Sequence, residues 1–161
     1  MGGVIKYFLK QVIPLLLIPY FASGVDFDLD KLVSDANRTA KPILLFLHKD
    51  GCGFCEKMIF DLEDKSISKI IQDNFIFVDI NRDDGETISF QGYRGTTRKF
   101  LKKLGVELYP TVAFLDGKGE FIYHIVGYRN PTKFKAILNY IRTGAYRRVT
   151  FEEFEDELHT N

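Results

Sequence analysis

The strongest constraint on the fold is an uninterrupted apolar run, ILLFL at residues 43–47, which is followed four residues later by a C-x-x-C motif. A run of this length without alternation is typical of a central strand that is buried on both faces. Residues 56–62 place apolar side chains at helical spacing, and residues 74–80, NFIFVDI, indicate the next strand. The chain is therefore expected to contain a βαβ unit with its cysteines, Cys52 and Cys55, at the turn from strand to helix.

The segments around this unit predict further helices and strands. The first helix is expected to be capped by Asp28 and to end before Pro42, and a polar connection of unusual length spans residues 81–95. A capping box of Thr150 and Glu153 opens a last helix. The remaining expected elements are helices at 66–73, 96–105 and 130–144, and strands at 110–115 and 120–126 about a tight turn. A length of 161 residues that are 45% hydrophobic suits one domain.

The first 24 residues predict a secretory signal peptide. Lys6 and Lys10 precede a short apolar run at 12–21, and small residues follow at 22–24. The alternative is an uncleaved N-terminal anchor. Removal of residues 1–24 takes away two of the 22 basic residues and none of the 22 acidic ones, so the mature domain at 25–161 would carry a net charge of 20 − 22 = −2. We therefore expect a periplasmic protein, and nothing in the charge pattern indicates binding of nucleic acid.

A cysteine pair at this spacing can serve as a structural staple, as part of a zinc site or as a redox pair. A structural staple is disfavoured, because a disulfide that closes a loop of two residues removes almost no freedom from the unfolded chain. A zinc site is disfavoured as well, because a closed site needs four ligands and His48, His124 and His159 form no spaced pair. We expect no metal.

A redox pair has a physical basis at this position. The start of a helix favours negative charge, which makes the thiolate of Cys52 available as a nucleophile. Cys55 lies one helical turn further on, where it can attack Cys52 and release a substrate. Gly53 lets the turn close without crowding, and Phe54 is expected to be partly exposed beside the motif.

The motifs together resemble the thioredoxin superfamily over about residues 28–143. The resemblance lies in CGFC at the turn, YPT at 109–111 opening a strand, DGKG between two strands, Gly127 and a last helix. It is greatest to exported members, namely the SoxW-type thioredoxins and the C-terminal periplasmic domain of DsbD. It implies a three-layer α/β/α fold with a central mixed sheet, followed by a short C-terminal helix at 150–159.

The resemblance also implies roles for individual residues. Cys52 matches the nucleophile and Cys55 the resolving cysteine, with Gly53 and Phe54 between them. Tyr109–Pro110 matches the cis bond of the family, and its loop is expected to bind substrate. Tyr93 and Tyr128 are further candidates for the edge of the site.

The chain departs from thioredoxin at two positions near the motif. Gly51 stands where thioredoxin has Trp, and Phe46 stands where thioredoxin has a buried Asp that moves protons. Glu56 is a candidate for that proton transfer, and the alternative is an ordinary solvated helix residue. The connection at 81–95 either helps to select a partner or is a surface insertion.

The dipeptide Gly53-Phe54 lacks the histidine of strongly oxidising members, which favours a reducing protein. We expect a monomeric thiol:disulfide oxidoreductase that needs no cofactor beyond the Cys52–Cys55 disulfide. Its partners would be exported proteins with disulfides, and a membrane electron carrier of the DsbD type would keep it reduced. The alternatives are an oxidase or isomerase of the same fold, and a non-enzymatic binding protein.

Overall fold

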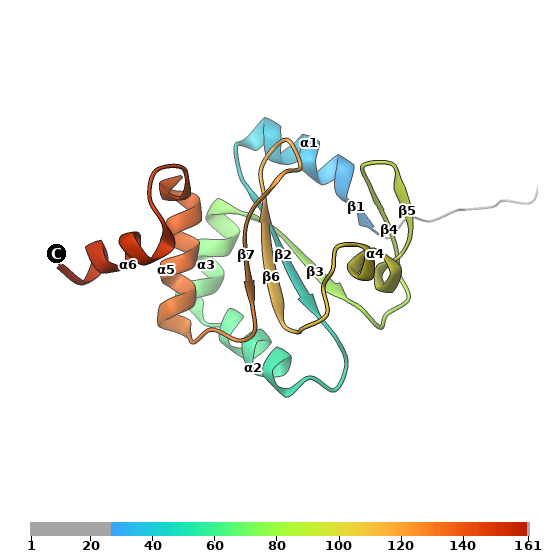
Figure 1. Ribbon diagram of the computed structural model, residues 1–161, viewed down its shortest axis with the longest axis horizontal. Helices are drawn as coiled ribbons and strands as arrows, with labels where there is room; N and C mark the ends of the chain where they lie inside the picture. Colours follow the sequence, from blue (N-terminus) through green and yellow to red (C-terminus); the bar gives the residue numbers. More distant parts are fainter. Residues whose placement is uncertain (1–26, 161) are drawn as a thin grey trace, which may run out of the picture.

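A four-stranded mixed sheet in the order β3–β2–β6–β7 forms the centre of the fold (Figure 1). The computed structural model describes residues 27–160, so the expected signal peptide at 1–24 lies outside the described residues. Strand β2 runs parallel to β3 and antiparallel to β6, and β6 runs antiparallel to β7. The strands are β2 (Ile43–His48), β3 (Ile76–Asn81), β6 (Thr111–Leu115) and β7 (Phe121–Val126).

Helices cover both faces of this sheet (Figure 1). One face carries α1 (Leu29–Thr39) and α4 (Thr97–Lys103). The other face carries α2 (Gly53–Leu62), α3 (Lys65–Asn74) and α5 (Pro131–Arg142), and the 3₁₀ turn η1 (Ala145–Arg147) and helix α6 (Phe151–Thr160) pack against α5. The expected three-layer α/β/α fold with a short C-terminal helix is confirmed.

Strand β2 separates two hydrophobic cores. Its residues 43–47 are all at most 1% exposed, and successive side chains point to opposite faces. Leu44 and Phe46 belong to the core under α2, α3 and α5, whereas Ile43, Leu45 and Leu47 belong to the core under α1 and α4. The unbroken apolar run is thus the part of the sequence that places the sheet between two layers of helices.

Two helices begin where their sequences indicate. The N–H of Lys31 donates to the Oδ1 atom of Asp28 at 3.1 Å, which caps α1. In the capping box before α6, the N–H of Thr150 donates to Glu153 Oε2 at 2.8 Å and the N–H of Glu153 donates to Thr150 Oγ1 at 3.3 Å. These hydrogen bonds confirm both expected caps. Each cap supplies an acceptor for N–H groups that have no partner inside the helix.

The connection at 81–95, which the sequence indicated only as a long polar loop, contains two short strands. It contains a hairpin of β4 (Thr87–Phe90) and β5 (Tyr93–Thr96), and β4 also pairs in parallel with the two-residue strand β1 (Phe27–Asp28). Ile88 and Phe90 point into the α1/α4 core and are at most 5% exposed. This alternation was present in the sequence, but the surrounding Gly, Asp and Thr residues concealed so short a strand.

No helix within residues 27–160 is both long and apolar enough to cross a membrane.

Candidate active site

The cysteine motif, the Tyr109–Pro110 loop and Gly127 lie at one edge of the central sheet. In the strand register, Leu47 near the end of β2 pairs with Thr111 at the start of β6, and Thr111 pairs with Val126 at the end of β7. The N–H of Gly127 donates to the carbonyl oxygen of Pro110 at 2.7 Å. Three segments that are far apart in the sequence therefore meet where β2 leads into the motif.

Cys52 is the N-cap residue of α2 and forms a disulfide with Cys55. The N–H of Cys55 donates to Cys52 Sγ at 3.2 Å, and the Cys52 carbonyl oxygen accepts from the N–H groups of Cys55 and Glu56 at 2.8 and 3.0 Å. Cys52 is half-buried, whereas Cys55 is only 1% exposed. When the pair is reduced, the sulfur of Cys52 is thus the one within reach of a substrate, and the helix N-terminus favours its thiolate.

The backbone explains the glycine at position 51 but not the one at position 53, so the expectation that Gly53 is needed to avoid crowding in the turn is wrong. Gly51 has φ +62°, a left-handed conformation that favours glycine over a residue as large as Trp. Gly53 is exposed, and a Cβ added to it would have no neighbouring atom within 4 Å. The approach to the cysteines is therefore open on this side.

The Tyr109–Pro110 peptide bond is cis, and Pro110 is buried directly before β6. Tyr109 is half-buried, and burial raises the pKa of its hydroxyl, while the nearby Arg82 guanidinium acts in the opposite direction. The hydroxyl of Thr111 donates to the carbonyl oxygen of Leu108 at 2.7 Å, which closes the turn around this bond.

Aromatic side chains border the motif on its other side. Phe54 is 65% exposed, and its ring stacks on Tyr128 with the ring centroids 6.2 Å apart. The Tyr128 hydroxyl donates to Asp61 Oδ2 at 2.7 Å, and Lys57 Nζ lies 5.0 Å from the Tyr128 ring centroid. The segment after β7 is thereby fastened to α2. Tyr93, in contrast, packs against Phe100 in the α1/α4 core.

The position of the proton-transfer aspartate of thioredoxin is filled by Phe46, which is fully buried. Glu56 lies exposed on the first turn of α2. At the end of β2, His48 pairs with Asp79, and their Nε2 and Oδ1 atoms are 2.7 Å apart. The hydrogen bond with Asp79 raises the pKa of His48.

Sequence reasoning did not identify Asp79, nor Arg82 and Asp83 in the turn after β3. Asp79 lies directly beside Phe46 in the register of β2 and β3, and a register cannot be read from one strand alone. Arg82 and Asp83 stand in the connection that the sequence marked only as long. The sequence feature that could have identified them is the pair of opposite charges directly after a predicted strand.

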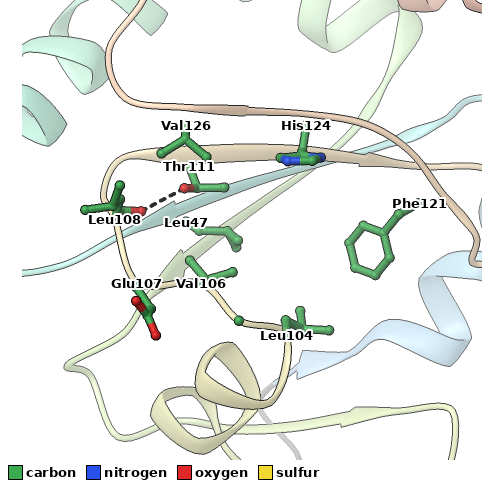
Figure 2. Close-up of a pocket in the computed structure, with 10 residues that line it drawn as sticks. Leu47, Leu104, Val106, Glu107, Leu108, Thr111, Phe121, His124 and Val126 are labelled. Atoms are coloured by element: carbon green, nitrogen blue, oxygen red, sulfur yellow. Dashed lines mark hydrogen bonds between the residues drawn. The ribbon is translucent and has the colours of Figure 1, made fainter.

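An apolar cavity of about 430 Å³ lies beside the Tyr109–Pro110 loop (Figure 2). Leu108, Thr111 and Val126 line the part that is nearest to the loop, and Phe121 lies at the far end. Leu108 and Val126 are exposed. The edge that carries the cysteines therefore has a hydrophobic flank.

Among residues 27–160, no three His, Cys, Asp or Glu side chains are grouped so that they could hold a metal ion. The redox group of this site is the disulfide itself.

Comparison with known proteins gives a family and a fold. A family model described as a thioredoxin-like domain matches residues 29–142. No curated protein matches the chain.

Solved structures include similar chains from bacteria and a plant. A thioredoxin-fold protein from Helicobacter pylori superposes with a TM-score of 0.64 at 24% identity, covering 76% of this chain and 82% of that one. A thioredoxin from Thermus thermophilus has a TM-score of 0.55 at 19% identity, covering 71% of this chain and 84% of that one. Oxidised thioredoxin O2 from Arabidopsis thaliana has a TM-score of 0.51 at 19% identity, covering 71% of this chain and 86% of that one. At these identities the structural likeness concerns the fold alone.

Proposed function

Because the chain belongs to the thioredoxin-like family and carries the Cys52–Cys55 disulfide of a thiol–disulfide oxidoreductase, we propose that it reduces disulfide bonds in exported proteins. One observation carries the proposal: Cys52 is accessible at the N-terminus of α2, while Cys55 is buried behind it. This asymmetry suits a nucleophile and a resolving thiol. A structural disulfide would gain nothing from it.

The reaction proceeds in two exchanges. The Cys52 thiolate attacks one sulfur of the substrate disulfide, a Cys52–substrate disulfide forms, and the other substrate sulfur leaves as a thiolate that takes up a proton. Cys55 then loses its proton and attacks Cys52 Sγ. The substrate leaves as a dithiol, the Cys52–Cys55 disulfide forms, and two electrons have passed to the substrate.

The substrate would lie against the edge of the sheet that bears the cis Tyr109–Pro110 bond. Exposed Phe54, within the motif, and exposed Leu108, next to Tyr109 in the chain, offer apolar contacts. These contacts suit a polypeptide segment with apolar side chains around its cysteine.

The reducing direction is supported by the dipeptide between the cysteines. Gly53 and Phe54 provide no cationic side chain that would stabilise the Cys52 thiolate and make the disulfide a strong oxidant. We propose that a membrane electron carrier of the DsbD type returns two electrons after each cycle. The signal-like sequence at 1–24 supports a periplasmic location.

Reduction of insulin disulfides, with dithiothreitol as the electron source, tests this function. The wild-type protein should accelerate the reaction, and Cys52→Ser should abolish the acceleration because the nucleophile is gone. In a separate incubation of reduced Cys55→Ala with exported proteins and without dithiothreitol, a mixed disulfide at Cys52 should accumulate, and mass spectrometry then identifies the trapped partner.

A Cys52→Ser protein that retains a bound partner while the wild type shows no exchange would indicate a binding protein instead. A reduction potential near −120 mV, the value of a strong oxidant, would reverse the proposed direction.

A further inference from the structure

The last residue of β3 and the turn that follows it, together residues 81–84, contact both loops that the exchange reaction must bring together. We infer that Arg82 and Asp83 are positioning residues that fix the Tyr109–Pro110 loop relative to Cys52, and that they thereby set the affinity for protein substrates. The inference rests on the proposed disulfide exchange and names residues outside the cysteine motif that serve it.

The turn holds the loop that leads into the cysteines. The N–H of Asp50, two residues before Cys52, donates to Asp83 Oδ2 at 3.2 Å. The side chain of Asn81 donates to Asp50 Oδ1 at 2.8 Å. The N–H of Arg82 donates to the carbonyl oxygen of His48 at 2.9 Å, which extends the pairing of β2 and β3 by one step. Asp50 is thus held through both its backbone and its side chain.

The same turn reaches the opposite loop through Arg82. The guanidinium carbon of Arg82 lies 5.6 Å from the ring centroid of Tyr109, within the range of a cation–π contact. Tyr109 immediately precedes Pro110. A displacement of Arg82 would therefore remove the guanidinium from the face of the Tyr109 ring, and with it the contact that holds the Tyr109–Pro110 loop.

Asp83 fixes the orientation of Arg82. The Nε and Nη2 atoms of Arg82 donate to the two carboxylate oxygens of Asp83 at 3.0 and 3.1 Å, a two-point contact that holds the plane of the guanidinium. Arg98 from α4 contacts the same carboxylate. The hydrogen bond from Arg82 lowers the pKa of Asp83, so the carboxylate stays ionised and keeps both arginines. The Asp83 side chain is 14% exposed.

These contacts form one continuous path from Cys52 to the Tyr109–Pro110 loop, through Asp50, Asp83 and Arg82. A protein substrate must meet the sulfur and the loop at the same time, whereas a small disulfide needs only the sulfur. Loss of the path should therefore weaken the use of protein substrates more than the use of small disulfides.

The test compares insulin with a small aromatic disulfide as substrates of the reduced protein. In Arg82→Met, the ratio of kcat/KM for insulin to that for the small disulfide should fall about three- to fivefold, mostly through KM, as expected for loss of one partly exposed cation–π contact. Arg38→Met is the matched control, because it removes an arginine–aspartate pair on α1, where Arg38 lies 2.9 Å from Asp35. Its ratio should equal that of the wild type.

A double-mutant cycle separates positioning from a general loss of structure. If Arg82 acts through the ring of Tyr109, Arg82→Met should change the ratio in the wild type but not in a Tyr109→Leu background. Equal effects in the two backgrounds, or an unchanged ratio in Arg82→Met with a normal unfolding transition, would overturn the inference. Failure of the wild type to exchange disulfides with either substrate would overturn the proposed function instead.

Discussion

The Nε2 atom of His48 lies 2.7 Å from the Oδ1 atom of Asp79, across the boundary between β2 and β3. The His48 side chain is 14% exposed and its ring stacks on Phe46 with the centroids 5.1 Å apart. Asp79 raises the pKa of His48 through the hydrogen bond, and Asp84 and Asp50 add smaller contributions of the same sign. The imidazole is thus a mostly buried titratable group at the end of β2, the strand that leads to the cysteines.

Asp79→Asn should lower stability in acid more than in base. The pKa of His48 is higher in the folded state than the unfolded value of 6.5, so the stabilisation is fully present below pH 6.5 and is lost as the pH rises through the folded pKa. Urea denaturation of Asp79→Asn should show a loss of roughly 0.5–1 kcal/mol at pH 5.5, as for a partly exposed ion pair. The deficit should shrink by pH 8.5.

Asp73→Asn is the control for this pH dependence. Asp73 pairs with Lys69 at 2.9 Å on α3, and lysine keeps its charge over the whole range. A difference between wild type and Asp79→Asn that is constant from pH 5.5 to 8.5 would contradict the assigned role of His48.

Alkylation should distinguish the two thiols of the reduced protein. Cys52 is half-buried at the N-terminus of α2, and Cys55 is 1% exposed. Iodoacetamide at neutral pH should modify Cys52 roughly tenfold faster than Cys55, because the helix N-terminus stabilises a thiolate and access is open. Peptide mass spectrometry measures the order, and the urea-unfolded protein, in which both thiols should react alike, is the control. Preferential labelling of Cys55 would reverse the assigned roles.

Tyr128 should contribute to stability through both its hydroxyl and its ring. Tyr128→Phe keeps the stack on Phe54 but leaves Asp61 without the 2.7 Å hydrogen bond, so unfolding should become easier by about 1 kcal/mol. Tyr128→Leu removes the ring as well and should cost more. Equal stability of wild type and Tyr128→Phe in urea would show that water replaces the hydroxyl without cost.

Phe151 should be the residue that holds α6 on the domain. Its side chain is 5% exposed and contacts Tyr140 and Tyr123, with ring centroids 5.4 and 6.2 Å away. Phe151→Ala should lower the free energy of unfolding by about 3 kcal/mol, as for other buried aromatic truncations. Leu158→Ala on the same helix is the control, because Leu158 is 50% exposed and should cost less than about 0.5 kcal/mol. Similar losses in the two variants would contradict this account.

The sequence predicted the elements that have strong local signals. The apolar run of β2, the cap at Asp28 and the capping box at Thr150 each depend on residues close together in the chain, and the structure confirms them. The β4–β5 hairpin was missed because each strand has four residues and is stabilised by packing of Ile88 and Phe90 on distant helices.

The parts of the site that depend on register could not be predicted in the same way. The neighbours Phe46 and Asp79 belong to strands separated by two helices, and Arg82 meets Tyr109 only after the sheet has assembled. The likeness to the SoxW and DsbD groups, the periplasmic location and the partners remain predictions. Of the residues expected at the edge of the site, Tyr109 and Tyr128 lie there, and Tyr93 belongs to the hairpin.

The position of β2 between the two cores has a consequence for how the molecule opens. Both cores use side chains of residues 43–47 as one of their walls. If the helices on one face separate from the sheet, β2 loses its packing on that face only. Its side chains on the other face stay packed, and its hydrogen bonds to β3 and β6 stay in place. The amide protons of these five residues should therefore exchange with solvent only when the entire domain unfolds, and their exchange rate gives its global stability.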